Sequence, residues 1–421
     1  MEAEPMTTPA PPCEIDVLDP RFYDDPWDAY RWLRAHSPIH WDAGNELWVI
    51  SRHADVSLIS RNPELYSAAE GVRPRVAAPM SIISMDDPEH TRQRRLINRG
   101  FTPAKVRALT DHIRELSNQI IDEVSDRGAM DFVQELAIHV PLIVIAELMG
   151  LDPQQRNDLY QWSDAMMAGD GHHAADDPVL HAAADAFGAY ALLCTELIDA
   201  RRAAPGERDD LISILTHAFD EGALTRDPNG PTSLDHLDGA LTNDELFMFL
   251  VLIVVAGNET TRNALSGGLV AFSQFPDEKQ RVIDNPALWE TAADEIIRFV
   301  SPVLSFSRTV TSDHQLGGAH LKAGDKVFML YQSANRDETV FTDPDVLKVD
   351  RSPNPHLAFG IGTHFCLGAN LARAEVQVVF EELFRRLGDI RVPDGGVGKR
   401  GNSTLVLSIE HLPAVFTPES R

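Results

Sequence analysis

Cys366 is the residue of this chain whose type and setting best suit metal chemistry. It follows a loop with two glycines, Gly360 and Gly362, and precedes a helix-favouring run that begins at Ala369. A cysteine at a helix start gains from the helix dipole and from unpaired N–H groups, both of which favour the thiolate. One thiolate with no second cysteine nearby suits an axial ligand to haem iron. The alternative is a buried structural cysteine followed by a helix.

A second candidate site lies where an apolar helix meets a polar segment. Residues 242–245 form a Thr-x-x-Glu capping box. Residues 246–256 are apolar all round, which predicts a helix in the middle of the protein. The polar run 257–262 then costs stability on a buried helix, so a function is expected there. The Thr260 hydroxyl lies one turn beyond the Ala256 carbonyl and can donate to it, which loosens the helix. The alternative is a helix that simply continues into solvent.

A third candidate is the basic segment that follows Pro88. Asp87 is a plausible N-cap, and His90 and Arg94 are four residues apart on one helix face. Such a pair of cations suits two carboxylates, although it more often forms a solvated face. No acidic residue occurs from His90 to Thr110, in a chain whose net charge is −27.

The string from Phe359 to Gly368 resembles the signature of the cytochrome P-450 haem-thiolate enzymes, Phe-x-x-Gly-x-His-x-Cys-x-Gly. It matches at Phe359, Gly362, His364, Cys366 and Gly368. The resemblance implies that Cys366 is the axial iron ligand of haem b and that Phe359 packs over the sulfur. It also implies that His364 reaches a haem propionate and that Gly368 keeps the following helix close to the porphyrin.

The polar run on the apolar helix matches the family's Ala-Gly-x-Glu-Thr-Thr at residues 256–261. By this resemblance the helix passes over the iron at Ala256, and Gly257 leaves room for dioxygen. Glu259 and Thr260 would manage the two protons that the reaction consumes, which is acid–base work for positioned groups.

Three further matches concern cations. The family's His-x-x-x-Arg corresponds to His90 and Arg94, and Arg308 matches a third cation, so the resemblance implies that all three bind haem propionates. The family's Glu-x-x-Arg corresponds to Glu295 and Arg298. With Arg336 these two are expected to form a charge network behind the haem that serves folding and haem retention.

The implied fold is mainly α with small β sheets, one triangular body enclosing the haem. Residues 1–14 are expected to be a disordered tail, and residues 15–421 a single catalytic domain. Strands are predicted at 39–41 and 46–51 around a turn at 42–45, and another at 403–409. Residues 66–84 cannot form one regular helix and are expected to roof the pocket. Residues 166–178 and 220–240 are predicted to be connections, and His172-His173 a solvated surface rather than a metal site.

Net charge, cysteine count and the N-terminal sequence limit the partners and the cellular compartment that can be expected for this chain. The strongly acidic charge argues against nucleic acid as a partner, because phosphate backbones demand basic surfaces. Three cysteines far apart do not suggest a disulfide framework, which favours a reducing cytoplasm. The N-terminus does not resemble a signal peptide, and the longest apolar run, residues 246–256, is too short to cross a bilayer.

The resemblance implies a soluble, bacterial-type monooxygenase that inserts one oxygen atom of dioxygen into a C–H bond of an apolar small molecule. It looks similar to actinobacterial enzymes acting on sterols, terpenoids or branched lipids. Electrons would come from a ferredoxin and a ferredoxin reductase, with docking expected on the basic segment. The candidate docking residues are Arg92, Arg95, Arg99, Lys105 and Arg107.

Two other functions are possible for a haem-thiolate chain. A peroxide-driven peroxygenase is one, but such relatives generally lack the acid–alcohol pair that this chain has at Glu259 and Thr260. A haem-thiolate sensor or carrier is the other, and turnover with a reductase system and an apolar substrate would separate it from an enzyme.

Overall fold

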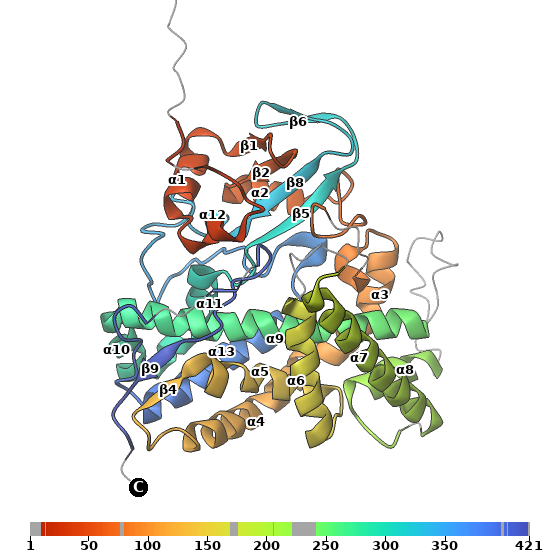
Figure 1. The fold of residues 1–421 in the computed structure, drawn as a ribbon, viewed down its shortest axis with the longest axis vertical. Helices are drawn as coiled ribbons and strands as arrows, with labels where there is room; N and C mark the ends of the chain where they lie inside the picture. The colour runs from red at the N-terminus through yellow and green to blue at the C-terminus, as the bar shows by residue number, and fades with distance from the viewer. Residues whose placement is uncertain are drawn as a thin grey trace, which may run out of the picture.

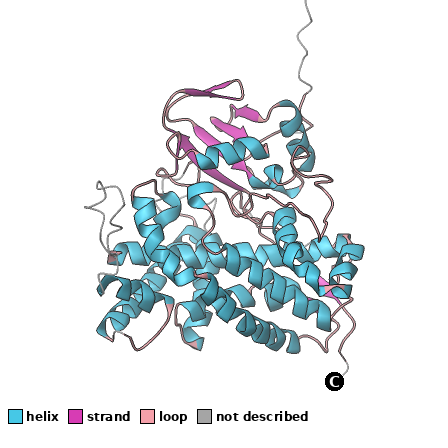
Figure 2. Ribbon diagram, turned by 180° about the vertical axis from the view of Figure 1, so that it is seen from behind, coloured by secondary structure: helices cyan, strands magenta, loops and turns pink. Residues whose placement is uncertain are grey.

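The computed structural model describes residues 10–12, 14–75, 80–168, 176–204, 206–220, 241–396, 400–401 and 403–419. Several predictions concern residues outside these ranges. They are most of the tail at 1–14, most of the connections at 166–178 and 220–240, the pair His172-His173 and part of the loop at 66–84. The described chain is mainly helical, and its largest sheet lies at one end of the molecule (Figure 1, Figure 2), which confirms the predicted fold class.

Thirteen α-helices lie within the described residues. They are α1 Trp27–His36, α2 His53–Arg61, α3 Glu89–Ile97, α4 Pro103–Asp122, α5 His139–Leu148, α6 Pro153–Ala168, α7 Pro178–Ala203, α8 Leu211–Asp220, α9 Asn243–Gln274, α10 Pro276–Asp284, α11 Trp289–Val300, α12 Tyr331–Ala334 and α13 Ala369–Arg386. Shorter turns of helix connect them, namely η1 Pro20–Asp24, η2 Ser81–Ser84, η3 Asn98–Phe101, the π-helical η4 Val133–Ala137, η6 Pro286–Leu288 and η7 Gly362–His364.

The strands form one sheet of five and two small pairs. They are β1 Ile39–Asp42, β2 Leu47–Ile50, β3 Tyr66–Ser67, β4 Ala129–Asp131, β5 Ser305–Val310, β6 His314–Leu316, β7 Ala319–Leu321, β8 Lys326–Leu330 and β9 Pro413–Val415. The larger sheet has the order β1-β2-β8-β5-β3, and only β2 and β8 run parallel. β1 and β2 form the predicted hairpin. The prediction of a strand at 403–409 is wrong, because its described residues make only isolated bridges at Val406 and Ile409.

Helix α9 is the central element and crosses the whole helical layer (Figure 1). It begins at the predicted capping box, in which the Thr242 hydroxyl accepts from the Glu245 N–H and the Glu245 carboxylate accepts from the Thr242 N–H. Its 32 residues run without interruption through the polar segment 257–262. The helix therefore continues through the interior there and does not leave it for solvent.

Two large apolar clusters meet along α9. One joins its C-terminal half to α4, α11 and α13, and the other joins its N-terminal half to α5, α7 and α8. An all-round apolar helix needs neighbours on every side, which explains why the sequence places α9 in the middle. No helix of the described chain has both the length and the apolar character needed to span a bilayer.

Candidate active site

The cysteine loop is shaped by backbone contacts that bring its two ends together. The Cys366 N–H donates to the Phe359 carbonyl at 2.9 Å, and the Phe365 N–H donates to the Gly362 carbonyl at 3.0 Å. Gly362 has a φ of +78°, and a Cβ there would lie 2.6 Å from the carbonyl oxygen of Ser60. Glycine is therefore required at this position, both for the conformation and for the close approach to α2.

Opposing influences act on the Cys366 thiol. Burial raises the pKa of this thiol, while the Gly368 N–H, Arg94 and Arg373 each favour the thiolate. Within the described residues no group of three or more His, Cys, Asp and Glu side chains could hold a metal ion. A single cysteine with donors and cations around it matches the ligand set of a haem thiolate.

Next to the loop, four nitrogen-bearing side chains come together: His90 and Arg94 from α3, Arg308 from β5 and His364 from η7. The rings of His90 and His364 lie 4.4 Å apart between centroids. Both ring nitrogens of His90 and Nε2 of His364 are buried, and none of them has a hydrogen-bond partner among the described residues. The structure thus brings together all four residues that were predicted to reach the propionates.

Among the described residues, the four have one ion-pair contact with a carboxylate, between His90 Nδ1 and Asp87 Oδ1 at 3.8 Å. Burial, with the nearby Arg308, His90 and Arg94, lowers the pKa of His364 to about 3. Among the described residues, neither Arg94 nor Arg308 forms an ion pair with a carboxylate: Arg94 donates to the Phe365 carbonyl at 2.8 Å, and Arg308 donates to the Ser307 carbonyl at 2.9 Å. Buried cations and unpartnered donors are costly unless an anion joins them. The two propionates of a haem fit this requirement.

The polar turn of α9 has the predicted local hydrogen bond. The Thr260 hydroxyl donates to the Ala256 carbonyl at 2.7 Å, and Ala256 is exposed although most of this helix is buried. Partly buried apolar side chains pack against the apolar cluster that surrounds this half of the helix. They are Met80 and Ile83 near η2, Trp162 and Met166 on α6, and Phe247, Ile253 and Val255 on α9.

Glu259 lies on another side of the helix and is only 2% exposed. Its Oε2 accepts from Arg262, whereas its Oε1 is buried and has no hydrogen-bond partner among the residues that the structure describes. Burial raises the pKa of Glu259, and Arg262 acts in the opposite direction. Arg262 in turn lies 3.8 Å from Asp164, whose side chain is 59% exposed. These three residues link the interior of α9 to the surface.

Gly257 has a packing reason that was not predicted. A Cβ at this position would lie 2.7 Å from Cδ1 of Ile145 on α5. Glycine at this position therefore lets α9 and α5 pack closely. Among the described residues, its two chain neighbours apart, no atom lies within 4 Å of a Cβ built at Gly368, the residue that precedes α13.

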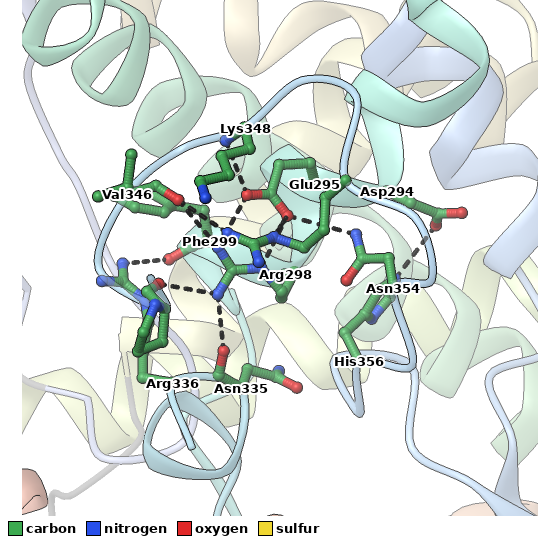
Figure 3. Close-up of polar contacts among 12 residues, drawn as sticks. Asp294, Glu295, Arg298, Phe299, Asn335, Arg336, Val346, Lys348, Asn354 and His356 are labelled. Atoms are coloured by element: carbon green, nitrogen blue, oxygen red, sulfur yellow. Dashed lines mark hydrogen bonds and ion pairs between the residues drawn. The ribbon is translucent and has the colours of Figure 1, made fainter. Parts of the chain in front are cut away.

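Glu295 and Arg298 form the predicted ion pair (Figure 3), and Arg351, which was not predicted, joins them through a hydrogen bond. The fully buried carboxylate of Glu295 accepts from Arg298 at 2.7 Å and from Arg351 at 2.9 Å. Arg336 instead donates to the Phe299 carbonyl and to Asp345. The sequence analysis missed Arg351, because no regular spacing connects it to α11.

The basic segment also differs in part from expectation. Arg92 is not an outward-facing residue: its side chain is 12% exposed and forms ion pairs with Glu89 and Glu245. Arg95 and Arg107 are exposed, and Lys105 lies 3.4 Å from Asp209. Helix α3 begins at Glu89, and the Asp87 carboxylate accepts from the Thr91 N–H at 3.1 Å.

Comparisons with known proteins agree with this geometry. The family model for cytochrome P-450 matches residues 230–407. A steroid C26-monooxygenase of Mycolicibacterium smegmatis is 37% identical over 409 residues, which cover 97% of each chain. One of Mycobacterium tuberculosis is 38% identical over 408 residues, covering 96% of this chain and 98% of the relative.

Solved structures give the same result. A protein of Bacillus megaterium in complex with testosterone has 29% sequence identity and a TM-score of 0.82, covering 94% of this chain and 99% of its own. A cytochrome P-450 of Mycobacterium marinum in complex with pseudoionone has 31% identity and a TM-score of 0.80, covering 97% of this chain and 100% of its own.

Proposed function

The chain belongs to the cytochrome P-450 family of haem b monooxygenases, and from this premise we propose that it hydroxylates a steroid, with residues 15–421 as one catalytic domain. One oxygen atom of dioxygen would enter a C–H bond, and the other would leave as water with two electrons and two protons. The observation that carries the assignment is the group of buried, unpartnered donors beside Cys366. It fits a doubly anionic cofactor held by one thiolate.

We assign the cofactor-binding roles to residues around the cysteine loop. Cys366 would ligate the iron, and His90, Arg94, Arg308 and His364 would bind the propionates through charge-assisted hydrogen bonds. Phe359, Gly368, Ala256 and Gly257 would border the porphyrin. When bound, haem supplies the activation of dioxygen, while the protein binds the substrate, excludes water and positions protons.

Proton delivery would depend on α9. The Thr260 hydroxyl, now donating to the Ala256 carbonyl, can rotate to donate toward the open side of the helix instead. Oε1 of Glu259 accepts no hydrogen bond from a described residue, so it can carry a proton. Arg262 bonds to Glu259 and lies 3.8 Å from the exposed Asp164, so protons from solvent would approach Glu259 along this side of the helix while the Arg262 guanidinium keeps its own protons. We propose that this acid–base role of Glu259 and Thr260 explains why a buried helix contains a polar turn that lowers its stability.

A steroid is the substrate class that the available observations favour. Two relatives are named steroid C26-monooxygenases, and one structural neighbour binds testosterone. The partly buried residues near η2, on α6 and on α9 are apolar, which suits a large apolar molecule. Titrating the ferric protein with steroids, acyclic terpenoids and branched fatty acids, and following the Soret band, tests this. Tighter binding of the acyclic compounds would reject the steroid.

The identity of the iron ligand has a direct spectroscopic test. The reduced, carbon-monoxide-bound protein should show the red-shifted Soret band of thiolate ligation, and Cys366→Ala should lose it. Cys194→Ala is the matched control, because Cys194 is buried on α7 beside Tyr190, away from the cysteine loop. A normal spectrum for Cys366→Ala, or an imidazole-type spectrum for the wild type, would contradict the assignment.

We further propose that a ferredoxin, reduced by its reductase, docks on α3. Arg94 of this helix contacts the Phe365 carbonyl of the cysteine loop, so the neighbouring exposed Arg95 lies near the iron site. An acidic donor would be repelled by most of a chain with net charge −27 but not by this segment. Arg99, Lys105 and Arg107 complete the proposed surface.

Salt dependence tests this docking surface, because exposed charges are screened over about 8 Å at physiological ionic strength. First-electron transfer from a ferredoxin should slow in Arg95→Glu with Arg99→Glu, and its salt dependence should flatten. Arg391→Glu, an exposed arginine beside β9, should leave both unchanged. If the double variant keeps the wild-type rate and salt slope, the donor docks elsewhere.

A further inference from the structure

A charged cluster next to the cysteine loop has no part in the function proposed above. Asp294 on α11 accepts from Arg373 Nε on α13 at 2.7 Å and from His356 Nε2 at 3.2 Å. His356 lies in the segment that leads into the cysteine loop, and Figure 3 shows its contact with Asp294. Three segments far apart in sequence thus meet at one carboxylate oxygen.

Hydrogen bonding fixes the charge state of the cluster. The Ala358 N–H donates to Nδ1 of His356 at 3.3 Å, so this ring carries its proton on Nε2 and donates it to Asp294. Burial opposes ionisation of Asp294, but the hydrogen bonds from His356 and Arg373 outweigh it and lower the pKa of this carboxyl. The cluster therefore pairs the Asp294 carboxylate with the Arg373 guanidinium, and the His356 ring donates to the same carboxylate.

Two members of the cluster, Arg373 and His356, lie against the Phe359 ring. The guanidinium carbon of Arg373 lies 4.6 Å from the centroid of the Phe359 ring, within the range of a cation–π contact. The His356 ring lies 5.7 Å from the same centroid. The Phe359 carbonyl in turn accepts from the Cys366 N–H at 2.9 Å.

We propose that Asp294 and His356 are positioning residues that hold Arg373 against Phe359, and that the Arg373 charge raises the reduction potential of the Cys366-bound iron. The inference rests on the proposed function, because Cys366 must be the ligand. Adding one electron to the iron adds negative charge, which a nearby cation stabilises. Asp294, an anion in contact with Arg373, opposes part of that effect.

Potentiometric titration of the haem-loaded protein tests the proposal without measuring turnover. At the potential where the wild type is half reduced, Arg373→Gln should lower the ferrous-to-ferric ratio by about threefold or more, where a tenfold change corresponds to about 59 mV for one electron. Asp294→Asn keeps an acceptor oxygen but removes the opposing charge, so it should raise the ratio. The double variant should return close to the wild type.

The opposite shifts expected for Arg373→Gln and Asp294→Asn distinguish an electrostatic effect from a general loosening of the structure. Loosening would shift the ferrous-to-ferric ratio of both variants in the same direction. Arg373→Lys keeps the charge and should stay close to the wild type, and a shift as large as that of Arg373→Gln would overturn the proposal. Arg385→Gln is the control, an exposed arginine farther along α13. If the wild type lacks the thiolate band with carbon monoxide, the proposed function fails. If the band is normal but all the potentials are equal, only this inference fails.

Discussion

At the scale of single residues, Glu375 is a buried carboxyl that forms no ion pair within the described part of the chain. It lies on α13, is 2% exposed, and its Oε1 has no hydrogen-bond partner. Burial raises the pKa of this carboxyl to about 8, and a hydrogen bond with Thr261 only partly offsets that effect. Glu375 is therefore protonated at neutral pH, where an unfolded chain would ionise it.

This raised pKa predicts a pH-dependent stability difference. Between about pH 4.5 and 8 the folded protein binds one more proton than the unfolded chain, so its stability falls as pH rises. Glu375→Gln removes this proton uptake. Its free energy of unfolding relative to wild type should rise by roughly 2–3 kcal/mol between pH 5 and 7, at 1.36 kcal/mol for each pKa unit. Urea unfolding of the haem-loaded protein at several pH values measures it.

Glu382 on the same helix provides a control of opposite sign. Burial opposes its ionisation, but hydrogen bonds from Asn118, Arg385 and Arg114 outweigh it and lower the pKa. Its stabilising contribution is present above the usual carboxyl pKa and is lost as pH falls, so Glu382→Gln should be most destabilising near neutral pH. A flat difference between pH 5 and 7 for Glu375→Gln would show that this carboxyl is ionised in the folded protein.

Variants of Thr260 and Glu259 should show different catalytic defects. Thr260→Ala should still bind substrate and consume reductant, with more of the electrons released as peroxide, while Thr260→Ser should remain close to wild type. Glu259→Gln should slow turnover by roughly 10²-fold or more, as for other acid–base groups. Product, reductant and peroxide are measured together. Full coupling of electrons to product in Thr260→Ala would exclude the hydroxyl from proton delivery.

At the scale of elements, the close contact between α9 and α5 limits the size of the side chain that α9 can have at position 257. Alanine in a helix interior is favoured over glycine by about 1 kcal/mol, but overpacking costs about 1–3 kcal/mol. Gly257→Ala should therefore leave the free energy of unfolding unchanged or lower it. In an Ile145→Val background, which removes Cδ1, the same change should stabilise by up to about 1 kcal/mol.

Gly188 on α7 is the matched control, because within the described chain no atom beyond its neighbours and its own helix backbone lies within 4 Å of a Cβ built there. Gly188→Ala should stabilise by about 1 kcal/mol in either background. The free energies of unfolding from urea titrations complete the cycle. If Gly257→Ala behaves identically with Ile145 and with Val at position 145, the close approach of the two helices is not what requires glycine.

At the scale of the whole molecule, Glu295 holds the long segment that leads to the cysteine loop. Beyond Arg298 and Arg351, its carboxylate accepts from the Lys348 N–H at 3.0 Å and from Asn354 at 3.3 Å. Breaking a buried ion pair by removing one partner costs about 3–5 kcal/mol. Glu295→Gln should lower the free energy of unfolding by about that amount and weaken haem retention.

Lys348→Ala is the matched control, since it removes only the surface ion pair with Asp343, worth less than about 1 kcal/mol. Its backbone N–H still reaches Glu295. Urea unfolding and the transfer of haem to a scavenging apoprotein compare the two variants. Equal small losses would mean that the segment is held by its packing and not by the Glu295 carboxylate.

The sequence by itself determined the features whose partners lie within a few residues. The capping box at Thr242 and the hydrogen bond from Thr260 to Ala256 follow from helix periodicity, since both partners lie within one turn. The cysteine loop was predicted because its glycines, cysteine and following helix are consecutive. The β1–β2 hairpin was predictable for the same reason, as its turn joins two adjacent strands.

Only the tertiary structure decided which distant side chains meet. Arg92 pairs with Glu245 from another helix, Arg351 takes the place expected for Arg336, and Asp294 joins Arg373 to His356. The expected strand at 403–409 failed because a strand needs a neighbour whose register local alternation does not specify. Hydrogen bonds within a turn depend on spacing along the chain, whereas contacts between elements depend on how their faces pack.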